Sequence, residues 1–251
     1  MSDSRAVLVT GGSRGIGRAI AHAFAAAGDR VAVHWGASRE RAEAVLTQLP
    51  GDGHVLVQAD LADADAVGRM VDEAAAALGR LDVLVNNAGV FTAHPPLSVS
   101  YEEWQAAWSR TLAVNLLGAA NATFRAVPHL VAAGGGAVVN VSSRGAFRGE
   151  PDTPAYGASK AGLNAFGQSM AIALAPHGIS VGTVAPGFVQ TEMAREVLDG
   201  PGGDAVRAQS PFGRVARSEE VASAVLWLAS PAARFSSGTV VDVNGASYLR
   251  T

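Results

Sequence analysis

The sequence predicts an α/β protein with a doubly wound Rossmann fold, in which a parallel seven-stranded sheet carries helices on both faces. Short Val-rich runs have apolar residues at successive positions, which is typical of strands buried on both faces of a parallel sheet. The expected strands are 6–10, 30–34, 55–58, 82–85, 137–141, 179–184 and 239–243. Strand and helix alternate through almost the whole chain, which implies right-handed crossovers and a ligand site at the carboxyl ends of the strands.

The expected helices space their apolar residues by three and four. They cover 15–27, 40–49, 63–78, 101–126, 155–175 and 219–228. Ser100 and Glu103 have the spacing of a capping box before the fourth helix, and Ser218 followed by two glutamates predicts the N-cap of the last one. The starts of these two helices are therefore well marked.

The length of 251 residues suits one such domain, and we expect residues 1–251 to form it. The stretch 187–217 interrupts the alternation, because it follows Pro186-Gly187 and contains a Gly-Pro-Gly-Gly run. A connection of this length in a compact domain is usually functional. We therefore expect residues 187–217 to form a substrate loop or lid.

The composition excludes several classes of protein. With 49% hydrophobic and 16% charged residues, the chain is neither disordered nor fibrous. The absence of cysteine excludes disulfides and thiolate metal sites, and we expect no metal. A net charge of −3 disfavours nucleic acid or an anionic membrane as a partner. Because no export signal and no bilayer-spanning stretch is visible, we expect a cytoplasmic protein.

A glycine-rich turn, Thr10-Gly11-Gly12-Ser13-Arg14-Gly15-Ile16-Gly17, follows the first strand and opens the first helix. Glycines let the backbone approach a pyrophosphate, and the helix N-terminus supplies free N–H donors. The predicted cofactor contacts here are Gly11, Ser13, Arg14, Gly15, Ile16 and Gly17. Their spacing misses the usual G-x-G-x-x-G pattern, so the glycines alone leave a plain strand-to-helix turn as the alternative.

The end of the second strand indicates the choice of cofactor. NAD-binding proteins usually place an acidic residue there to bind the ribose 2′-hydroxyl. This chain has Trp35, Ser38 and Arg39 in that stretch, and no carboxylate before Glu40. Arg14 and Arg39 could neutralise a 2′-phosphate, with Ser38 as a hydroxyl donor, which favours NADP(H) over NAD(H). The alternative is that both arginines are ordinary solvated charges.

The reacting groups are expected at the carboxyl ends of the fourth and fifth strands. Ser143 follows the fifth strand, and Tyr156 and Lys160 lie four residues apart on the next helix, so they share one face. A lysine ammonium near a phenol lowers the pKa of tyrosine from about 10, so that Tyr156 could protonate a carbonyl oxygen as hydride reaches the carbon. Ser143 could hold the same oxygen. A half-buried packing pair is the alternative for Tyr156 and Lys160.

Together these residues resemble the short-chain dehydrogenase/reductase family over nearly the full length of the chain. The matching motifs are Thr10 to Gly17, Asp60-Leu61, Asn86-Asn87-Ala88-Gly89, Asn115, Ser143, Tyr156-Gly157-Ala158-Ser159-Lys160 and Pro186-Gly187 with Thr191. Within the family, the chain looks most like 3-oxoacyl-[acyl-carrier-protein] reductase-like members. The resemblance implies an NAD(P)-dependent enzyme that interconverts a carbonyl and a secondary alcohol.

The resemblance also implies roles for individual residues. Asn115, Ser143, Tyr156 and Lys160 would form a catalytic tetrad, in which Asn115 positions a water on a proton relay to Lys160 and Lys160 also bonds the nicotinamide ribose. Asp60 would contact the adenine. The remaining implied cofactor contacts are Leu61, Asn87, Ala88, Gly89, Pro186 and Gly187, with Val189 and Thr191 at the nicotinamide carboxamide.

A homotetramer is implied as well, with the helices 101–126 and 155–175 at one interface and the C-terminal strand region at another. Apolar residues on more than one face of these helices support it, namely Leu112, Leu116, Leu163 and Phe166. The chain departs from the family pattern at Gly182, where Asn is common, at Ser218, where Pro is common, and at Asn244-Gly245-Ala246, where Asp-Gly-Gly is frequent.

The substrate is less well marked. Family members that use the acidic acyl carrier protein carry arginines before the fifth strand and late in the tyrosine helix, but residues 131–135 and 170–173 contain none. Arg144 and Arg148 could steer an anionic substrate, yet we expect them to be solvated charges balanced by nearby Glu150 and Asp152.

We therefore expect an NADP(H)-dependent carbonyl reductase or alcohol dehydrogenase that takes a small molecule. The alternatives are a 3-oxoacyl-[acyl-carrier-protein] reductase, a catalytically silent dinucleotide-binding sensor and an S-adenosylmethionine methyltransferase, which shares the glycine-rich turn. The tetrad disfavours the last two, because neither needs Tyr156 with Lys160.

Overall fold

A single parallel sheet organises the chain. The computed structural model describes residues 4–250, apart from the side chain of Met193. Seven strands pair in the order β3-β2-β1-β4-β5-β6-β7, and every pairing is parallel. Their bounds are β1 Ala6–Val9, β2 Arg30–Trp35, β3 Val55–Gln58, β4 Val83–Asn86, β5 Gly136–Val141, β6 Ile179–Pro186 and β7 Val240–Val243. The predicted doubly wound sheet is confirmed.

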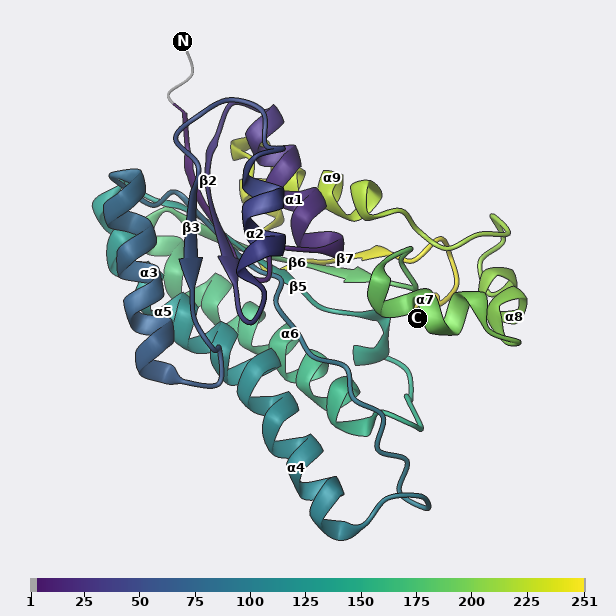
Figure 1. Cartoon of the computed structure of the whole chain (residues 1–251). Coiled ribbons are helices and arrows are strands. Elements are labelled where there is room, and N and C mark those ends of the chain that lie inside the picture. Colours follow the sequence, from purple (N-terminus) through teal and green to yellow (C-terminus); the bar gives the residue numbers. More distant parts are fainter. Residues whose placement is uncertain (1–3, 251) are drawn as a thin grey trace.

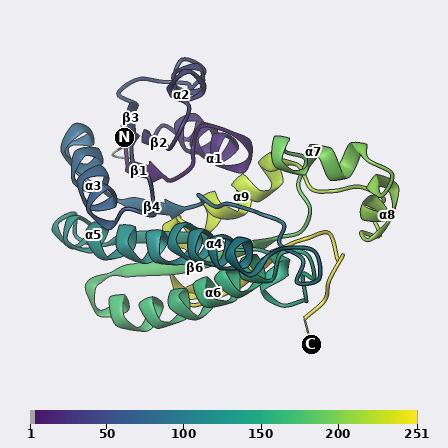
Figure 2. The ribbon, with the colours of Figure 1, turned by 60° about the horizontal axis from the view of Figure 1, so that its bottom comes forward.

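Helices cover both faces of the sheet (Figures 1 and 2). One face packs against α1 (Gly15–Ala26), α2 (Arg39–Leu46) and α9 (Ser218–Leu228), through buried side chains such as Phe24 and Val225. The other packs against α3 (Ala64–Leu78), α5 (Gly118–Ala132) and α6 (Pro154–Leu174), through side chains such as Met70 and Leu130. The strand order reverses between β1 and β4, and ligands of such sheets bind at the carboxyl edge beside this switch point.

The expected helix 101–126 consists of three pieces. α4 (Tyr101–Leu112) passes into a π-helical turn, η1 (Ala113–Leu117), which continues into α5. The predicted capping box is confirmed, because Glu103 N–H donates to Ser100 Oγ (3.2 Å) and Ser100 N–H donates to a Glu103 carboxylate oxygen (2.7 Å). π-Helical turns often occur at functional sites, and this one contains Asn115.

The predicted N-cap of the last helix is wrong by one residue. Arg217 is the N-cap of α9, and Ser218 is already its first helical residue. The Glu220 carboxylate accepts from Arg217 N–H at 2.7 Å, which satisfies a free donor without any need for a serine hydroxyl. Ser218 thus occupies the first helical position, where the proline common in the family that the sequence resembles is also tolerated.

Residues 187–217 contain regular structure that the sequence pattern did not indicate. They include two short helices, α7 (Glu192–Asp199) and α8 (Gly203–Ala208). A parallel bridge between Val189 and Ala216 joins the two ends of the segment, with Gln190 N–H donating to Ala216 O at 2.9 Å. The segment therefore projects from a closed base (Figure 1).

Two departures from the family pattern have physical counterparts. A Cβ at Gly182 would lie 3.0 Å from Leu228 Cδ2, so the Leu228 side chain fills the space that a larger residue would need. Ala246 has φ 58°, in the left-handed region that favours glycine. The preceding Gly245 has φ 59°, and its carbonyl accepts from Ser210 Oγ at 2.7 Å. The C-terminal segment is thus bonded to the segment 187–217.

No helix within residues 4–250 is long and apolar enough to cross a membrane.

Candidate active site

The four predicted catalytic residues come from three parts of the chain that meet at the carboxyl edge of the sheet. Ser143 follows β5, Tyr156 and Lys160 lie on α6, and Asn115 lies in η1. Gly89, just after β4, lies beside two of them: a Cβ there would lie 3.3 Å from Asn115 Oδ1 and 3.6 Å from Lys160 Nζ. The absence of a side chain at position 89 leaves room for both the amide and the ammonium.

Lys160 is buried, and its Nζ donates to Val141 O at 2.8 Å. Burial lowers the pKa of Lys160 from 10.5 to about 8. It is also the only lysine in the sequence, which contains 18 arginines. An arginine could not take its place, because a guanidinium is larger and stays charged at any accessible pH. This exclusive use of lysine is a sequence signal that motif reading overlooked.

The Tyr156 phenol lies beside Lys160, whose Nζ is 5.7 Å from the centre of the phenol ring. Phe91 packs edge-on against the same ring at 4.9 Å. Burial raises the pKa of Tyr156, the charge of Glu150 acts in the same direction, and a hydrogen bond from Ser143 partly opposes both. In the chain alone the pKa therefore lies above its ordinary value, opposite to the shift that the sequence predicts from Lys160.

Ser143 and Asn115 are both held in place by backbone groups. The Ser143 hydroxyl oxygen accepts from Gly145 N–H at 3.0 Å. Asn115 Oδ1 accepts from Val90 N–H at 2.8 Å, and its Nδ2 donates to Val90 O at 3.0 Å and to Ser159 Oγ at 3.2 Å. The amide of Asn115 thus ties the π-helical turn both to the segment after β4 and to α6.

The glycine-rich turn is packed so closely that its glycines cannot carry side chains. Gly11 has φ 66°, and a Cβ there would lie 2.9 Å from Ala88 Cα. A Cβ at Gly17 would lie 2.1 Å from Gly11 O, so no side chain fits. Asn87 Nδ2 donates to Thr10 O (2.8 Å) and to Gly11 O (3.2 Å), which fixes the turn against the end of β4. The turn and the N-terminus of α1 fit the pyrophosphate of a dinucleotide.

His34 is a site residue that sequence reasoning missed. Its Nδ1 accepts from Gly11 N–H at 2.9 Å, so its Nε2 carries the proton and donates to Ala59 O at 3.1 Å. Burial lowers the pKa of His34, which keeps the ring neutral and able to accept. This neutral histidine supports the glycine-rich turn from the interior of the sheet.

The predicted 2′-phosphate residues do not all lie together. Arg14 lines a cavity of about 690 Å³, together with Arg41 of α2. Arg41 also pairs with Glu192 at 3.3 Å. Arg39 is not among the residues that line this cavity and pairs with Glu43 on the exposed side of α2 at 2.8 Å. Nearby, Trp35 is half-buried at the end of β2, and Ser38 accepts from Arg41 N–H at 3.4 Å as the N-cap of α2.

At the expected adenine end, Asp60 pairs with Arg110 of α4 at 2.9 Å. The hydrogen bond from Arg110 lowers the pKa of Asp60, with a smaller contribution from Ala62 N–H. The neighbouring Leu61 side chain is buried in the core. Arg110 therefore joins Asp60 at this rim, a contact that no motif indicated.

At the expected nicotinamide end, the base of the segment 187–217 meets the glycine-rich turn. Pro186 ends β6. Gly187 packs against Asn244, because a Cβ added at position 187 would lie only 3.0 Å from Asn244 Cβ. Val189 is buried, and the Thr191 hydroxyl caps α7. The Thr191 methyl group lies 3.4 Å from a Cβ position at Gly15. The base of this segment therefore lies next to the glycine-rich turn.

The fold, the glycine-rich turn and the Ser–Tyr–Lys group fit an NAD(P)-dependent oxidoreductase that acts on CH–OH groups. Comparison with known proteins agrees. Residues 11–246 match the family described as enoyl-(acyl carrier protein) reductase. The chain is 37% identical over 251 residues to the 3-oxoacyl-[acyl-carrier-protein] reductase FabG of Staphylococcus aureus, covering 99% of this chain and 100% of the relative.

Another relative, the cis-4-hydroxycyclohexanecarboxylate dehydrogenase of Sinomonas cyclohexanicum, is 40% identical over 243 residues, which cover 96% of this chain and 95% of the relative. A solved structure of a short chain dehydrogenase from Burkholderia cenocepacia J2315 in complex with NADP superposes with a TM-score of 0.88 at 37% identity, covering 97% of each chain. The chain belongs to the short-chain dehydrogenase/reductase family, and the methyltransferase alternative is set aside.

The burial of Lys160 makes a prediction about stability and pH. In the unfolded chain the Lys160 amine is protonated below a pH of about 10.4, whereas burial in the folded chain lowers its pKa to about 8. The buried ammonium therefore lowers stability at pH 7, and this cost disappears as the pH rises from about 8 to about 10.4. Lys160→Met removes the cost of the buried charge but also loses the hydrogen bond to Val141 O. The net effect is expected to be an increase of about 1–2 kcal/mol in the free energy of unfolding at pH 7.

Urea unfolding of the wild type and Lys160→Met at pH 7 and pH 10 measures this difference, with Arg234→Met as a control for the removal of an exposed cation. The gain should shrink toward pH 10. Equal stabilisation at both pH values would show that it does not come from the ammonium.

Proposed function

We propose that the protein is an NADP(H)-dependent short-chain dehydrogenase/reductase that interconverts a ketone and a secondary alcohol, with Tyr156 as the general acid and base. The observation that carries this proposal is the clustering of four side chains: Asn115 and Lys160 both lie beside the side-chain-free position Gly89, and Tyr156 lies beside Lys160 and within reach of Ser143. A catalytically silent sensor would have no need to keep a buried lysine charge beside a phenol.

The cofactor would lie along the residues that flank the sheet edge, from Asp60 through the glycine-rich turn to Thr191. When bound, the nicotinamide ring supplies or accepts the hydride. The Tyr156 hydroxyl gives its proton to the carbonyl oxygen during reduction and takes it back during oxidation, while the Ser143 hydroxyl donates to the same oxygen. The Lys160 ammonium stabilises the phenolate left on Tyr156 and would hold the nicotinamide ribose, and Asn115 would position a water on the proton relay.

Removal of the proton donor tests the mechanism. Tyr156→Phe is expected to lower kcat roughly 100-fold or more while leaving the NADPH dissociation constant nearly unchanged, since only the hydroxyl is lost. Turnover is followed as NADPH oxidation with a panel of ketones, and binding as the enhancement of NADPH fluorescence. Tyr101→Phe, at an exposed tyrosine of α4, is the matched control. Wild-type turnover by Tyr156→Phe would falsify the mechanism.

We further propose that the enzyme prefers NADP(H). No carboxylate lies between Trp35 and Arg39, and Arg14 shares its cavity with Arg41, which supplies a second guanidinium in place of the solvent-facing Arg39. The Burkholderia cenocepacia relative is described in complex with NADP.

Dissociation constants for NADPH and NADH test this preference. We expect the wild type to bind NADPH at least about tenfold more tightly, the scale of one charge-assisted contact. Arg14→Ala should erode the ratio, and Trp35→Asp should reverse it, because the new carboxylate accepts from the ribose hydroxyl and repels the phosphate. Comparing Arg39→Ala with Arg41→Ala identifies the second cation. Equal affinities in the wild type would overturn the preference.

We propose a small carbonyl or alcohol as substrate instead of an acyl carrier protein. The relatives named above act on substrates as different as a carrier-bound oxoacyl group and a hydroxycyclohexanecarboxylate, so family membership does not decide the substrate. Residues 131–135 and 170–173, where carrier-using members have arginines, contain none. Reduction of free ketones but not of acyl carrier thioesters would support this choice.

A homotetramer is the proposed assembly. Leu117, Phe124 and Val131 recur every seven residues from η1 along α5 and are 56%, 77% and 43% exposed, which gives one side of α5 an apolar stripe. Of the residues that the sequence suggested for the interface, Leu163 is only 1% exposed and belongs to the core, which corrects that expectation.

Light scattering at micromolar concentration is expected to give the mass of four chains. Phe124→Glu should yield smaller species, because it places a charge in the apolar stripe, whereas Ala76→Glu on the exposed side of α3 should not. A monomeric wild type would contradict the proposal.

A further inference from the structure

Arg144 is a buried cation without an acidic partner. It directly follows Ser143 and is only 4% exposed, so the expectation of a solvated charge is wrong. Its Nη1 donates to Ser247 Oγ at 2.7 Å and its Nη2 to Gln209 Oε1 at 2.6 Å, while the guanidinium lies 5.1 Å from the centre of the Phe188 ring. In the part of the chain that the structure describes, no ion pair includes Arg144.

Such an arrangement is unfavourable for the chain alone. Arginine cannot shed its proton under ordinary conditions, and burying a charge that meets only neutral partners is costly. Burial lowers the pKa of Arg144, and the nearby charge of Arg148 acts in the same direction, with Glu150 opposing both. The site therefore has a positive charge that the residues in direct contact with it do not neutralise.

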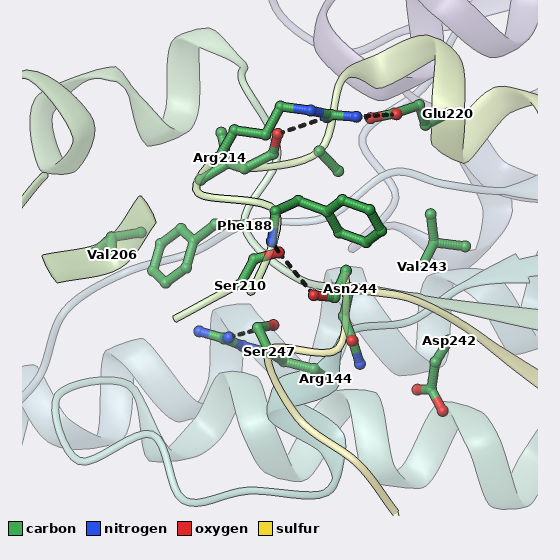
Figure 3. Close-up of a pocket in the computed structure, with 14 residues that line it drawn as sticks. Arg144, Phe188, Val206, Ser210, Arg214, Glu220, Asp242, Val243, Asn244 and Ser247 are labelled. Atoms are coloured by element: carbon green, nitrogen blue, oxygen red, sulfur yellow. Dashed lines mark hydrogen bonds and ion pairs between the residues drawn. The ribbon is translucent and has the colours of Figure 1, made fainter. Parts of the chain in front are cut away.

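The guanidinium lines a cavity of about 350 Å³ (Figure 3). Phe188, Val206, Phe212 and Val243 supply apolar walls. The two acidic side chains of this lining are already engaged: Glu220 pairs with Arg214 at 2.6 Å, and Asp242 with Arg250 at 2.7 Å. A partly apolar pocket of this size, with one charged group that has no ion-pair partner, suits a small organic anion.

We propose that Arg144 binds a carboxylate group of the substrate in this cavity, so that the enzyme acts on an oxo acid and the corresponding hydroxy acid. This inference rests on the proposed function. The planar guanidinium would exchange its two neutral acceptors, Ser247 and Gln209, for the two oxygens of one carboxylate, the geometry in which arginine binds most strongly.

The lining of the cavity limits where the carboxylate lies relative to the reacting carbonyl. Arg144 lines the cavity, whereas Ser143, Tyr156 and Lys160 are not among its lining residues. Acids whose carboxylate is several bonds away from the ketone are therefore favoured over 2-oxo acids.

Matched pairs of substrates test the proposal. We expect 4-oxopentanoate and 4-oxocyclohexanecarboxylate to be reduced with a kcat/KM at least about tenfold above that of their methyl esters. The difference should arise mainly from a lower KM for the acids. A tenfold ratio is the scale of one charge-assisted hydrogen-bonded pair. In Arg144→Met the ratio of acid to ester should fall to near one, and Arg144→Lys should restore part of it. Arg148→Met, an arginine of the same loop, should keep the wild-type ratio.

A binding measurement separates this inference from the proposed function. Benzoate should bind to the NADPH-saturated wild type by calorimetry, benzamide should bind much more weakly, and Arg144→Met should lose the difference. If no ketone is reduced in either form, the proposed function fails while benzoate still tests Arg144. Equal use of acid and ester by the wild type, an equal loss for both in Arg144→Met, or no binding of benzoate would each overturn the role of Arg144.

Discussion

The burial of one ammonium group constrains the whole site. Lys160 is held away from water by its hydrogen bond to the last residue of β5, and Gly89 has no side chain where the ammonium meets the amide of Asn115. The π-helical turn places that amide, which accepts from Val90 N–H and donates to Val90 O and to Ser159 Oγ on α6. The end of β5, the π-helical turn and α6 are thus all arranged around the Lys160 ammonium.

Much of this arrangement could be predicted from the sequence because it follows from local patterns. Strands buried on both faces are apolar at successive positions, and Ser143, Tyr156 and Lys160 fall at the right edge once strand and helix are placed. The glycine-rich turn could also be placed, although its spacing differs from the usual pattern, because its glycines lie between a strand and a helix.

What the sequence did not reveal depends on contacts between distant segments. His34 looks like an ordinary strand residue until its ring is seen to accept from Gly11 and to donate to Ala59. Arg144 reads as a loop charge, since the partners that bury it lie 65 and 103 residues further along the chain. The five-residue π-helical turn and the six-residue helix α8 are too short to show a clear periodicity, and the eight-residue α7 lies in a stretch interpreted as a loop. Arg217 became an N-cap through the carboxylate of Glu220 instead of its own side chain.

The left-handed backbone at Ala246 has a consequence for motion at the site. An alanine in this conformation is strained by about 1–2 kcal/mol relative to the right-handed region, and such strain persists only where neighbouring contacts hold it. One of those contacts is the hydrogen bond from Ser210 to Gly245, which links the C-terminal segment to the segment that contains α7 and α8. Outward movement of the segment 187–217 would break this bond, and relaxation of Ala246 would then offset part of the free energy that the movement costs.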